Sequence, residues 1–358
     1  MVGLTPLIEL VLDVPGGGVP NPNPHDAAPP YPVYSSALIS LPKTSVMELV
    51  RGLHNLRPHH RGCVATIGNF DGVHAGHQAI LKRLKAHGER VGLPICVLIF
   101  EPQPREYFAP NSAPPRLTRL RDKLALLEQQ GVDRVLCLAF NRRLRELSAD
   151  EFIQQVLIDG LGVQHLEVGD DFRFGCDRAG DFSLLQERGQ HHGFTVESAS
   201  TVAENGERVS STRVRQVLAE GDFAQAERLL GRPFSITGRV LHGQKLGRQL
   251  GAPTANVQLK RLSAPLNGVY RVSVELDGVR QPGVANIGTR PTVDGDGRAH
   301  LEVHLLDFSG DIYGRRITVV FHEKLRDEQR FDSLDELQAA IKADFATARA
   351  QWAAELNK

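Results

Sequence analysis

The order in which apolar segments follow one another changes near residue 232, and this change constrains the fold of the chain. Before it, five short apolar segments alternate with amphipathic stretches, such as 117–130 and 149–157. The second stretch opens with a capping box at Ser148 and Glu151. The expected strands are Cys63–Ile67, Ile95–Phe100, Val135–Leu138, Leu166–Val168 and Thr195–Glu197. Such alternation predicts an α/β fold with a doubly wound parallel sheet covered on both faces.

After residue 232, strands follow strands without helices between them. The segments Ile236–Val240, Val269–Glu275, Val279–Ile287, His300–Leu306 and Ile317–Phe321 read as strands, and the last helical stretch runs from Ser333 to about Leu356. Asp277-Gly278 is a hairpin signal. This half predicts a small β-barrel with a C-terminal helix. We expect three regions: an extension over 1–46, a first domain over 47–231 and a second over 232–358.

Composition narrows the class of protein. The 358 residues contain 42 Lys plus Arg and 42 Asp plus Glu, so nothing attracts the whole chain to nucleic acid or to an anionic membrane. No apolar stretch approaches the ~20 residues of a membrane span. The four cysteines are far apart, and three lie in expected strands, which favours reduced, buried thiols in a cytoplasmic protein. Composition says nothing about oligomeric state.

The first 46 residues differ from the rest of the chain. They contain no lysine or arginine before Lys43, and 15–32 is rich in proline, glycine and asparagine. A secretory signal needs a basic start and a continuous apolar core, and both are absent. Such a composition buries little apolar surface, so we expect a disordered extension without a catalytic role.

A glycine-rich turn with two histidines follows the first expected strand. Glycines at 72 and 76 let a ligand approach the backbone, and a helix start supplies free N–H groups and the positive end of its dipole. His74 and His77, three residues apart, share one helix face and can reach the same anion. The pattern favours a phosphate site, although the same spacing suits a metal if a third ligand is present. The candidate residues are Gly68, Phe70, Asp71, Gly72, His74, Gly76 and His77.

The ten residues from Gly68 to His77 resemble the H-x-G-H adenylyl-transfer motif of the nucleotidylyltransferase superfamily. The longer string G-N-F-D-G-V-H-x-G-H is similar to that of the bacterial bifunctional riboflavin kinase and FMN adenylyltransferase family, also called FAD synthetases. Further strings match this family from Met47 onward. The resemblance implies ATP as co-substrate, riboflavin and FMN as substrates, and FMN and FAD as products.

Three further segments of the first half belong to this expected site. The first, from Phe100 to Arg105, lies just past the second expected strand at the same sheet edge, and we assign no role to Gln103 in it. In Ser210-Ser211-Thr212-Arg213-Val214-Arg215, hydroxyls at a helix start can cap the helix or hold phosphate oxygens. Arginines at a helix start are unfavourable for stability because they lie at the positive end of the helix dipole. Their presence therefore favours an anionic ligand. The string resembles the superfamily element I-S-S-T-x-x-R, and the candidates are Ser210, Ser211, Thr212 and Arg215. The segment 168–175 resembles the flavin-side loop of the family, with Asp170 and Phe172 as candidates; its alternative interpretation is an ordinary turn.

The second half contains a cationic, glycine-rich loop that is no Walker P-loop, because the spacing is wrong and no G-K-[ST] occurs. Its candidates for ATP phosphates are Gly243, Lys245, Gly247 and Gly251. The following Pro-Thr-Ala-Asn places Thr254 and Asn256 on one side of an extended strand, and such oxygen donors suit Mg²⁺ with ATP and water as its other ligands. The segment resembles the P-T-A-N motif of riboflavin kinases. A polar turn in a barrel is the alternative.

A kinase that acts on an alcohol benefits from a general base. In Leu301-Glu302-Val303-His304-Leu305, Glu302 and His304 alternate with apolar residues, and the string resembles the catalytic strand of the kinases, in which the glutamate is the base. Arg326 lies in a segment that resembles the loop covering the flavin.

Three functions remain to be compared. The first is a bifunctional enzyme that phosphorylates riboflavin to FMN and then transfers AMP from ATP to FMN, giving FAD and pyrophosphate. The second is an adenylyltransferase for another phosphorylated substrate, with an accessory β-barrel. The third is a non-catalytic flavin-binding protein, which predicts loss of catalytic residues, whereas His74, His77, Thr254, Asn256 and Glu302 are all present. We favour the first.

Overall fold

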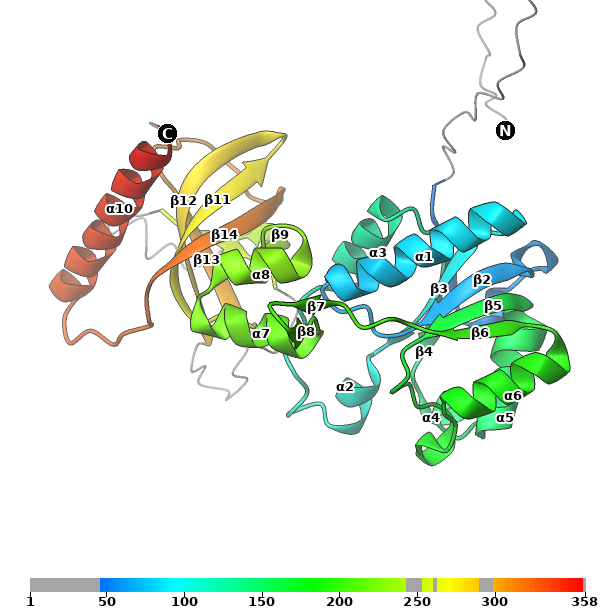
Figure 1. Cartoon of the computed structure of the whole chain (residues 1–358). Helices are drawn as coiled ribbons and strands as arrows, with labels where there is room; N and C mark the ends of the chain where they lie inside the picture. Colours follow the sequence, from blue (N-terminus) through cyan, green and yellow to red (C-terminus); the bar gives the residue numbers. More distant parts are fainter. Residues whose placement is uncertain (1–45, 243–252, 260–262, 290–298, 357–358) are drawn as a thin grey trace, which may run out of the picture. The chain divides into compact units, whose positions relative to one another are not determined.

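The first half of the chain builds a six-stranded parallel sheet in the order β1-β4-β3-β2-β5-β6 (Figure 1). The computed structural model describes residues 46–242, 253–259, 263–289 and 299–356. The strands are β1 (Glu48–Arg51), β2 (Cys63–Ile67), β3 (Ile95–Glu101), β4 (Arg134–Ala139), β5 (Val163–Val168) and β6 (Thr195–Ser198). The five expected strands are confirmed, most with slightly wider bounds. The sequence did not indicate β1, a short edge strand that pairs with β4.

Helices cover both faces of this sheet, as the doubly wound prediction requires. On one face, α1 (Ala75–Val91) and α3 (Leu120–Gln129) bury Leu81 and Leu127 against alternate strand residues such as Ile99. On the other face, α5 (Ala149–Phe152), the π-helical segment Ile153–Leu161 and α6 (Phe182–His192) pack against the remaining strand residues. The Ser148–Glu151 capping box is present at the start of α5. Short helices α2 (Pro104–Phe108) and α4 (Arg142–Arg145) lie in the connections.

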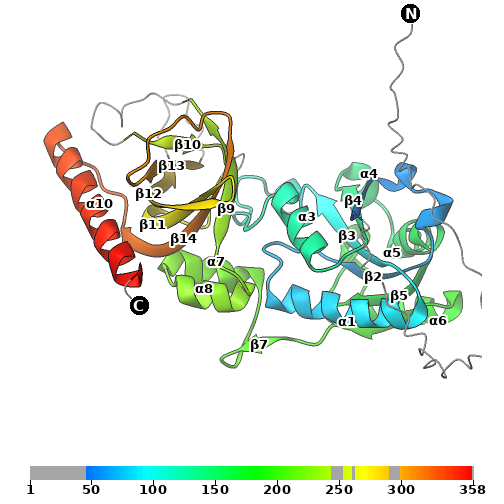
Figure 2. The same cartoon turned by 90° about the horizontal axis from the view of Figure 1, so that it is seen from above.

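The second half closes into a six-stranded barrel, which Figure 2 shows from above, and this confirms the predicted architecture. Its strands are β9 (Ser235–Leu241), β10 (Ala255–Val257), β11 (Gly268–Leu276), β12 (Val279–Thr289), β13 (Ala299–Leu305) and β14 (Arg316–Arg326), in the order β10-β13-β12-β11-β14-β9. The expected hairpin joins β11 to β12. Both of its turn residues have positive φ, 50° at Asp277 and 79° at Gly278, as a tight hairpin turn requires.

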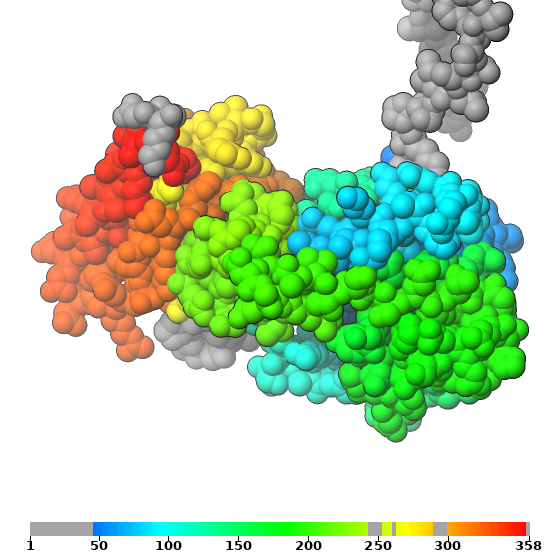
Figure 3. Space-filling model, viewed as in Figure 1, coloured from blue at the N-terminus to red at the C-terminus, as the bar shows by residue number. Residues whose placement is uncertain are grey.

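Helix α10 (Leu334–Leu356) packs on the outside of the barrel, and its red atoms continue the surface of the barrel in Figure 3. Its Ala348 is buried with Val269 and Val284 of the barrel, and Trp352 packs against the same cluster. The guanidinium of Arg271 lies 4.7 Å from the Trp352 ring centroid and pairs with Glu355. These contacts hold the C-terminal half of α10 on the strands.

Two helices precede the barrel along the chain. They are α7 (Ser211–Glu220) and α8 (Phe223–Leu230), preceded by the small hairpin of β7 (Ala203–Glu204) and β8 (Glu207–Arg208). Phe223 of α8 contacts Tyr270 and Phe321 of the barrel, so both helices share one apolar cluster with the barrel strands. The predicted boundary between residues 231 and 232 lies in the link between α8 and β9.

The buried positions expected for three cysteines are confirmed in the described residues. Cys63, Cys96 and Cys137 are buried in β2, β3 and β4, and all four cysteines are unpaired. None of the helices in the described ranges is long and apolar enough to cross a membrane. The expected disordered extension, apart from residue 46, lies outside the described residues.

Candidate functional sites

Two histidine rings face each other where β2 runs into α1. His74 is the N-cap residue of α1 and His77 lies in its first turn, and their ring centroids are 3.7 Å apart. Phe70 packs against the other side of His77, at 4.6 Å. Within the described structure, the Nδ1 atoms of both histidines are buried without a hydrogen-bond partner. The turn therefore presents two imidazoles beside the free N–H groups of a helix start, as the sequence predicts.

Burial keeps both imidazoles neutral. It lowers the pKa of His74 from 6.5 to about 4, although the carboxylate of Asp71 works in the opposite direction. It also holds the pKa of His77 well below its usual value, with His74 and Lys123 adding to the effect. At neutral pH the pair therefore offers hydrogen bonds rather than full charges, and an anion bound beside the rings would raise both pKa values.

Asp71 anchors the histidine turn instead of facing solvent. Its side chain is 2 % exposed and accepts hydrogen bonds from the backbone N–H groups of Leu117 and Thr118, both at 3.0 Å, and from the Thr118 hydroxyl. Arg215 pairs with the same carboxylate and donates to the Pro115 carbonyl. The Ser211 hydroxyl donates to the Asp71 backbone carbonyl at 2.9 Å. Asp71 and Arg215 therefore join the turn to residues 115–118 and to α7.

Most of the sequence candidates in the first half line one cavity of about 580 Å³. Those that line it are Gly68, Phe70, Asp71, His74, Gly76, His77, Phe172, Ser210 and Ser211. Gly72, Asp170, Thr212 and Arg215 do not, and the neighbouring Asp171 lies where Asp170 was expected. Gly72 has φ 83°, and a Cβ there would meet Leu117 at 2.8 Å. Its glycine is therefore explained by the backbone and by packing.

Lys123 is a site residue that the sequence reasoning missed. It is fully buried in α3, and its ammonium group donates to the Asn69 carbonyl of the histidine turn at 2.6 Å. Burial lowers its pKa. A sequence signal existed, because Lys123 falls on the apolar face marked by Leu120, Leu124 and Leu127. A lysine at such a position needs a buried polar partner.

A second cavity, of about 660 Å³, adjoins the first and is rich in aromatic rings. Gly68, Asn69, Asp171 and Phe172 line both cavities. Phenylalanines and arginines make up much of the remaining wall: Phe100, Phe108, Phe140, Phe152, Phe174, Arg105, Arg145, Arg173 and Arg178. Aromatic faces suit a planar ring system and arginines suit a phosphate. Of the residues that line this cavity, the sequence indicated Gly68 and Phe172 as candidates. Arg173 and Phe174 follow Phe172 in the segment 168–175, and most of the other phenylalanines and arginines come from separate connections.

The third cavity, of about 630 Å³, lies between the outer face of the barrel and α10. Thr254 and Glu302 line it, and the β10–β13 register places Asn256 directly opposite Glu302. The His304 imidazole donates from Nδ1 to the Pro253 carbonyl at 2.9 Å, stacks on Phe345 of α10 at 4.1 Å and has a pKa lowered by burial. The candidates Gly243, Lys245, Gly247 and Gly251 lie outside the described residues.

Arg326, a candidate flavin contact, is engaged with the protein itself. Its guanidinium donates to both carboxylate oxygens of Asp344 on α10, at 2.9 to 3.2 Å, and lies 5.6 Å from the Phe331 ring centroid. Arg326 and Asp344 both line the cavity. The ion pair therefore holds the N-terminal half of α10 beside the cavity.

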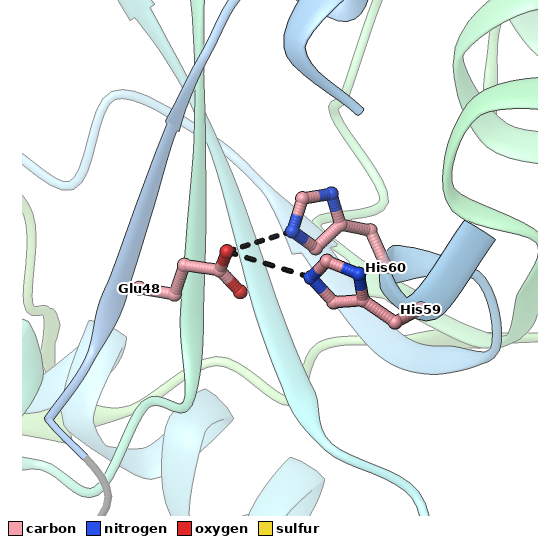
Figure 4. A group of neighbouring side chains, drawn as sticks. All are labelled: Glu48, His59 and His60. Carbon is pink, nitrogen blue, oxygen red and sulfur yellow. Dashed lines mark hydrogen bonds and ion pairs between the residues drawn. The ribbon is translucent and has the colours of Figure 1, made fainter. Parts of the chain in front are cut away.

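Glu48, His59 and His60 form a group with metal-ligand chemistry at the edge of the parallel sheet (Figure 4). The hydrogen bonds argue against a metal there. Nδ1 of His60 accepts from the Arg57 backbone N–H at 2.8 Å, so Nε2 carries the proton and donates to Glu48 at 2.7 Å. Arg134, 3.4 Å from the same carboxylate, adds a positive charge. We interpret the group as a structural contact that links β1 to the turn preceding β2.

Two family models match different parts of the chain. Residues 56–213 match the FAD synthetase family, and residues 230–352 match the riboflavin kinase family. A bifunctional riboflavin kinase/FMN adenylyltransferase from Pseudomonas fluorescens is 70 % identical over 304 residues, which is 85 % of this chain and 97 % of the relative. The protein of the same name from Escherichia coli K12 is 56 % identical over 305 residues, with the same coverage.

A solved structure covers most of the chain. It is described as a macrolide-efflux protein from Streptococcus pneumoniae, is 30 % identical and superimposes with a TM-score of 0.71 over 85 % of this chain and 99 % of its own. Both halves of the chain are thus matched in sequence, and curated relatives are matched over nearly their whole length. The chain belongs to the family of bifunctional riboflavin kinases and FMN adenylyltransferases.

Proposed function

We propose that the two reactions of this bifunctional enzyme occur at two separate sites, one in each half of the chain. As a family member, the chain is a riboflavin kinase and an FMN adenylyltransferase, with ATP as co-substrate of both reactions. The assignment rests on the different residues found at two cavities. The paired imidazoles of His74 and His77 line one of them. Glu302 and Thr254 line another, and Asn256 lies directly opposite Glu302. The domains we propose are 47–231 and 232–358, after an extension over 1–46.

We assign riboflavin phosphorylation to the cavity between the barrel and α10. Glu302 takes the proton from the terminal hydroxyl of the ribityl chain while the hydroxyl oxygen forms a bond to the γ-phosphorus of ATP. The bond from that phosphorus to the β-phosphate oxygen breaks, and ADP leaves. Thr254 and Asn256 have the oxygen donors that fit Mg²⁺, which would neutralise charge on the ATP phosphates. On their sequence alone, Gly243, Lys245, Gly247 and Gly251 stay proposed as contacts to the ATP phosphates.

Adenylyl transfer belongs at the histidine cavity. A phosphate oxygen of FMN attacks the α-phosphorus of ATP, the bond to the bridging oxygen breaks, and pyrophosphate leaves with FAD as the other product. Because the FMN phosphate is already ionised, no base is needed. His74, His77 and the N–H groups of α1 stabilise the phosphates. Ser210, Ser211, Thr212 and Arg215 support the same region from α7, and Asp71 holds the turn in place.

The aromatic cavity is the place for the isoalloxazine ring of FMN. It shares Asn69, Asp171 and Phe172 with the histidine cavity, so a flavin stacked among its phenylalanines can direct its phosphate toward ATP. Asp170 adjoins this wall on the same loop. In the kinase half, we propose that Arg326 affects flavin binding indirectly, because its ion pair with Asp344 holds α10 beside the cavity. We further propose a cytoplasmic location, which the unpaired cysteines support.

A reciprocal pair of variants tests the two-site proposal. Glu302→Gln should reduce FMN formation from riboflavin about 10²- to 10⁴-fold, through the turnover number, and leave FAD formation from added FMN unchanged. His77→Ala should do the reverse, with FAD formation falling about 10²-fold or more. Both products are resolved by chromatography after incubation with ATP and Mg²⁺. Equal loss of both activities in either folded variant would contradict two separate sites.

A further inference from the structure

Asn286 lies beside Glu302 in a position that the proposed reaction leaves without a role. Strand β13 runs between β10 and β12, and the strand register sets Glu302 opposite Asn256 on one side and opposite Asn286 on the other. Directly opposed residues of antiparallel strands project from the same face, with Cβ atoms about 4.5–5.5 Å apart. Asn256, Glu302 and Asn286 therefore form one polar row across three strands.

The chemistry of Asn286 indicates that it serves a ligand. Its side chain is half-buried and lines the cavity between the barrel and α10. The carboxamide oxygen is buried, and no residue in the described part of the chain donates a hydrogen bond to it. Leaving such a group without a partner is costly, and native proteins keep few of them. A hydroxyl group is a suitable partner because it can both donate and accept.

The order of residues along this row gives a direction to the bound substrate. Asn256 and Thr254, the proposed magnesium ligands, mark the ATP side of Glu302. On the other side comes Asn286, and Val269 of β11 lies opposite Asn286 in turn. The lining of the cavity also includes the apolar side chains of Leu337, Ile341 and Phe345 on α10, next to the Arg326–Asp344 ion pair. Across the strands, the row thus runs from a proposed metal ligand to the base, then to the Asn286 amide and to Val269.

We propose that the Asn286 carboxamide hydrogen-bonds a secondary hydroxyl of the ribityl chain and thereby positions the terminal hydroxyl against Glu302. The order Asn256, Glu302, Asn286 matches the order in the substrate, which runs from the reacting hydroxyl along the hydroxylated chain toward the aromatic ring. Asn286 then selects for a flavin with a polyhydroxylated side chain. This inference rests on the assignment of riboflavin phosphorylation to this cavity.

Binding measurements with two flavins test the proposed contact. Riboflavin carries the hydroxylated chain, whereas lumiflavin has the same ring with a methyl group in its place. In fluorescence-quenching titrations, Asn286→Leu should weaken riboflavin binding about tenfold and leave lumiflavin binding within twofold of wild type. Gln281→Leu, on the same strand but outside the cavity lining, is the matched control and should change neither.

Kinetics separate positioning from general support of the fold. Asn286→Leu should raise the riboflavin KM and lower kcat for FMN formation, with the ATP KM and FAD formation from FMN unchanged. Asn286→Asp retains an acceptor oxygen, so it should bind riboflavin better than the leucine variant.

The outcomes distinguish this inference from the assignment beneath it. If the Glu302→Gln variant still phosphorylated riboflavin at close to the wild-type rate, the assignment of this cavity to the kinase reaction would be wrong. With that site intact, wild-type riboflavin affinity and kinetics in Asn286→Leu would overturn the role of Asn286. Equal weakening of riboflavin and lumiflavin would also overturn it, because the contact would then be to the ring.

Discussion

The stability of the first half should depend on pH through the buried histidine pair, and Asn in place of His74 should remove part of that dependence. Burial lowers the pKa of His74 from 6.5 to about 4 in the folded protein. The unfolded chain therefore takes up a proton before the folded one does. The contribution of His74 to stability is complete above pH 6.5 and is lost as the pH falls from 6.5 toward 4.

The size of the effect follows from the two pKa values. With one pKa unit equal to 1.36 kcal/mol, the difference between 6.5 and about 4 amounts to about 3.4 kcal/mol once the pH is below both values. Between pH 7.5 and pH 5, the linkage relation gives a loss of about 2 kcal/mol from His74 alone. His77, whose pKa is also lowered, adds a loss of the same sign.

Urea unfolding at a series of pH values measures this loss. Between pH 7.5 and pH 5, His74→Asn should lose about 2 kcal/mol less than wild type does, because asparagine does not titrate. His192→Asn, at an exposed position, controls for the substitution itself. If wild type and His74→Asn lost stability in parallel over this range, the buried imidazole would not be the source, and the argument from burial would fail.

Three further predictions concern other parts of the chain. Asp71→Ala should lower the free energy of unfolding by about 3–5 kcal/mol in urea titrations, because it leaves the Arg215 guanidinium without its buried partner; a change below ~1 kcal/mol would contradict the anchoring role of Asp71. Thr254→Val should raise the Mg²⁺ concentration needed for half-maximal FMN formation about tenfold, while an unchanged requirement would exclude Thr254 as a ligand. Removing residues 1–46 should leave both activities and the melting temperature unchanged, and a drop of several degrees in calorimetry would show that the segment docks on the folded chain.

Local patterns in the sequence predicted the architecture because they report burial directly. Short apolar segments such as Cys63–Ile67 indicated strands covered on both faces, and the Asp277-Gly278 turn indicated a hairpin. The same reasoning missed β1, since its four residues are only partly buried and pair with β4, more than 80 residues away. Edge pairing of this kind leaves little periodicity to detect.

For the candidate sites, the sequence likewise predicted the residue types but not the contacts that these residues make. The histidine turn and the Thr254–Asn256 segment are local strings whose residue types already imply phosphate and metal chemistry. The tertiary structure decided which of these residues face a cavity: it turned Arg215 toward Asp71 and Arg326 toward Asp344. A side chain's type limits the partners it can have, whereas its actual partner depends on which groups folding brings within reach.

Asn286 shows the limit of the sequence most clearly. Read along the chain, it is one polar residue in a strand of the barrel, and its spacing from Glu302 suggests no relation. In the strand order β10-β13-β12, Asn286 and Asn256 lie on either side of Glu302. By itself, the sequence determined the elements, the two folds and the chemistry of the local motifs, because these depend on periodicity and residue type. Only the tertiary structure decided the neighbours across strands, because strand order and register arise from the packing of the whole barrel.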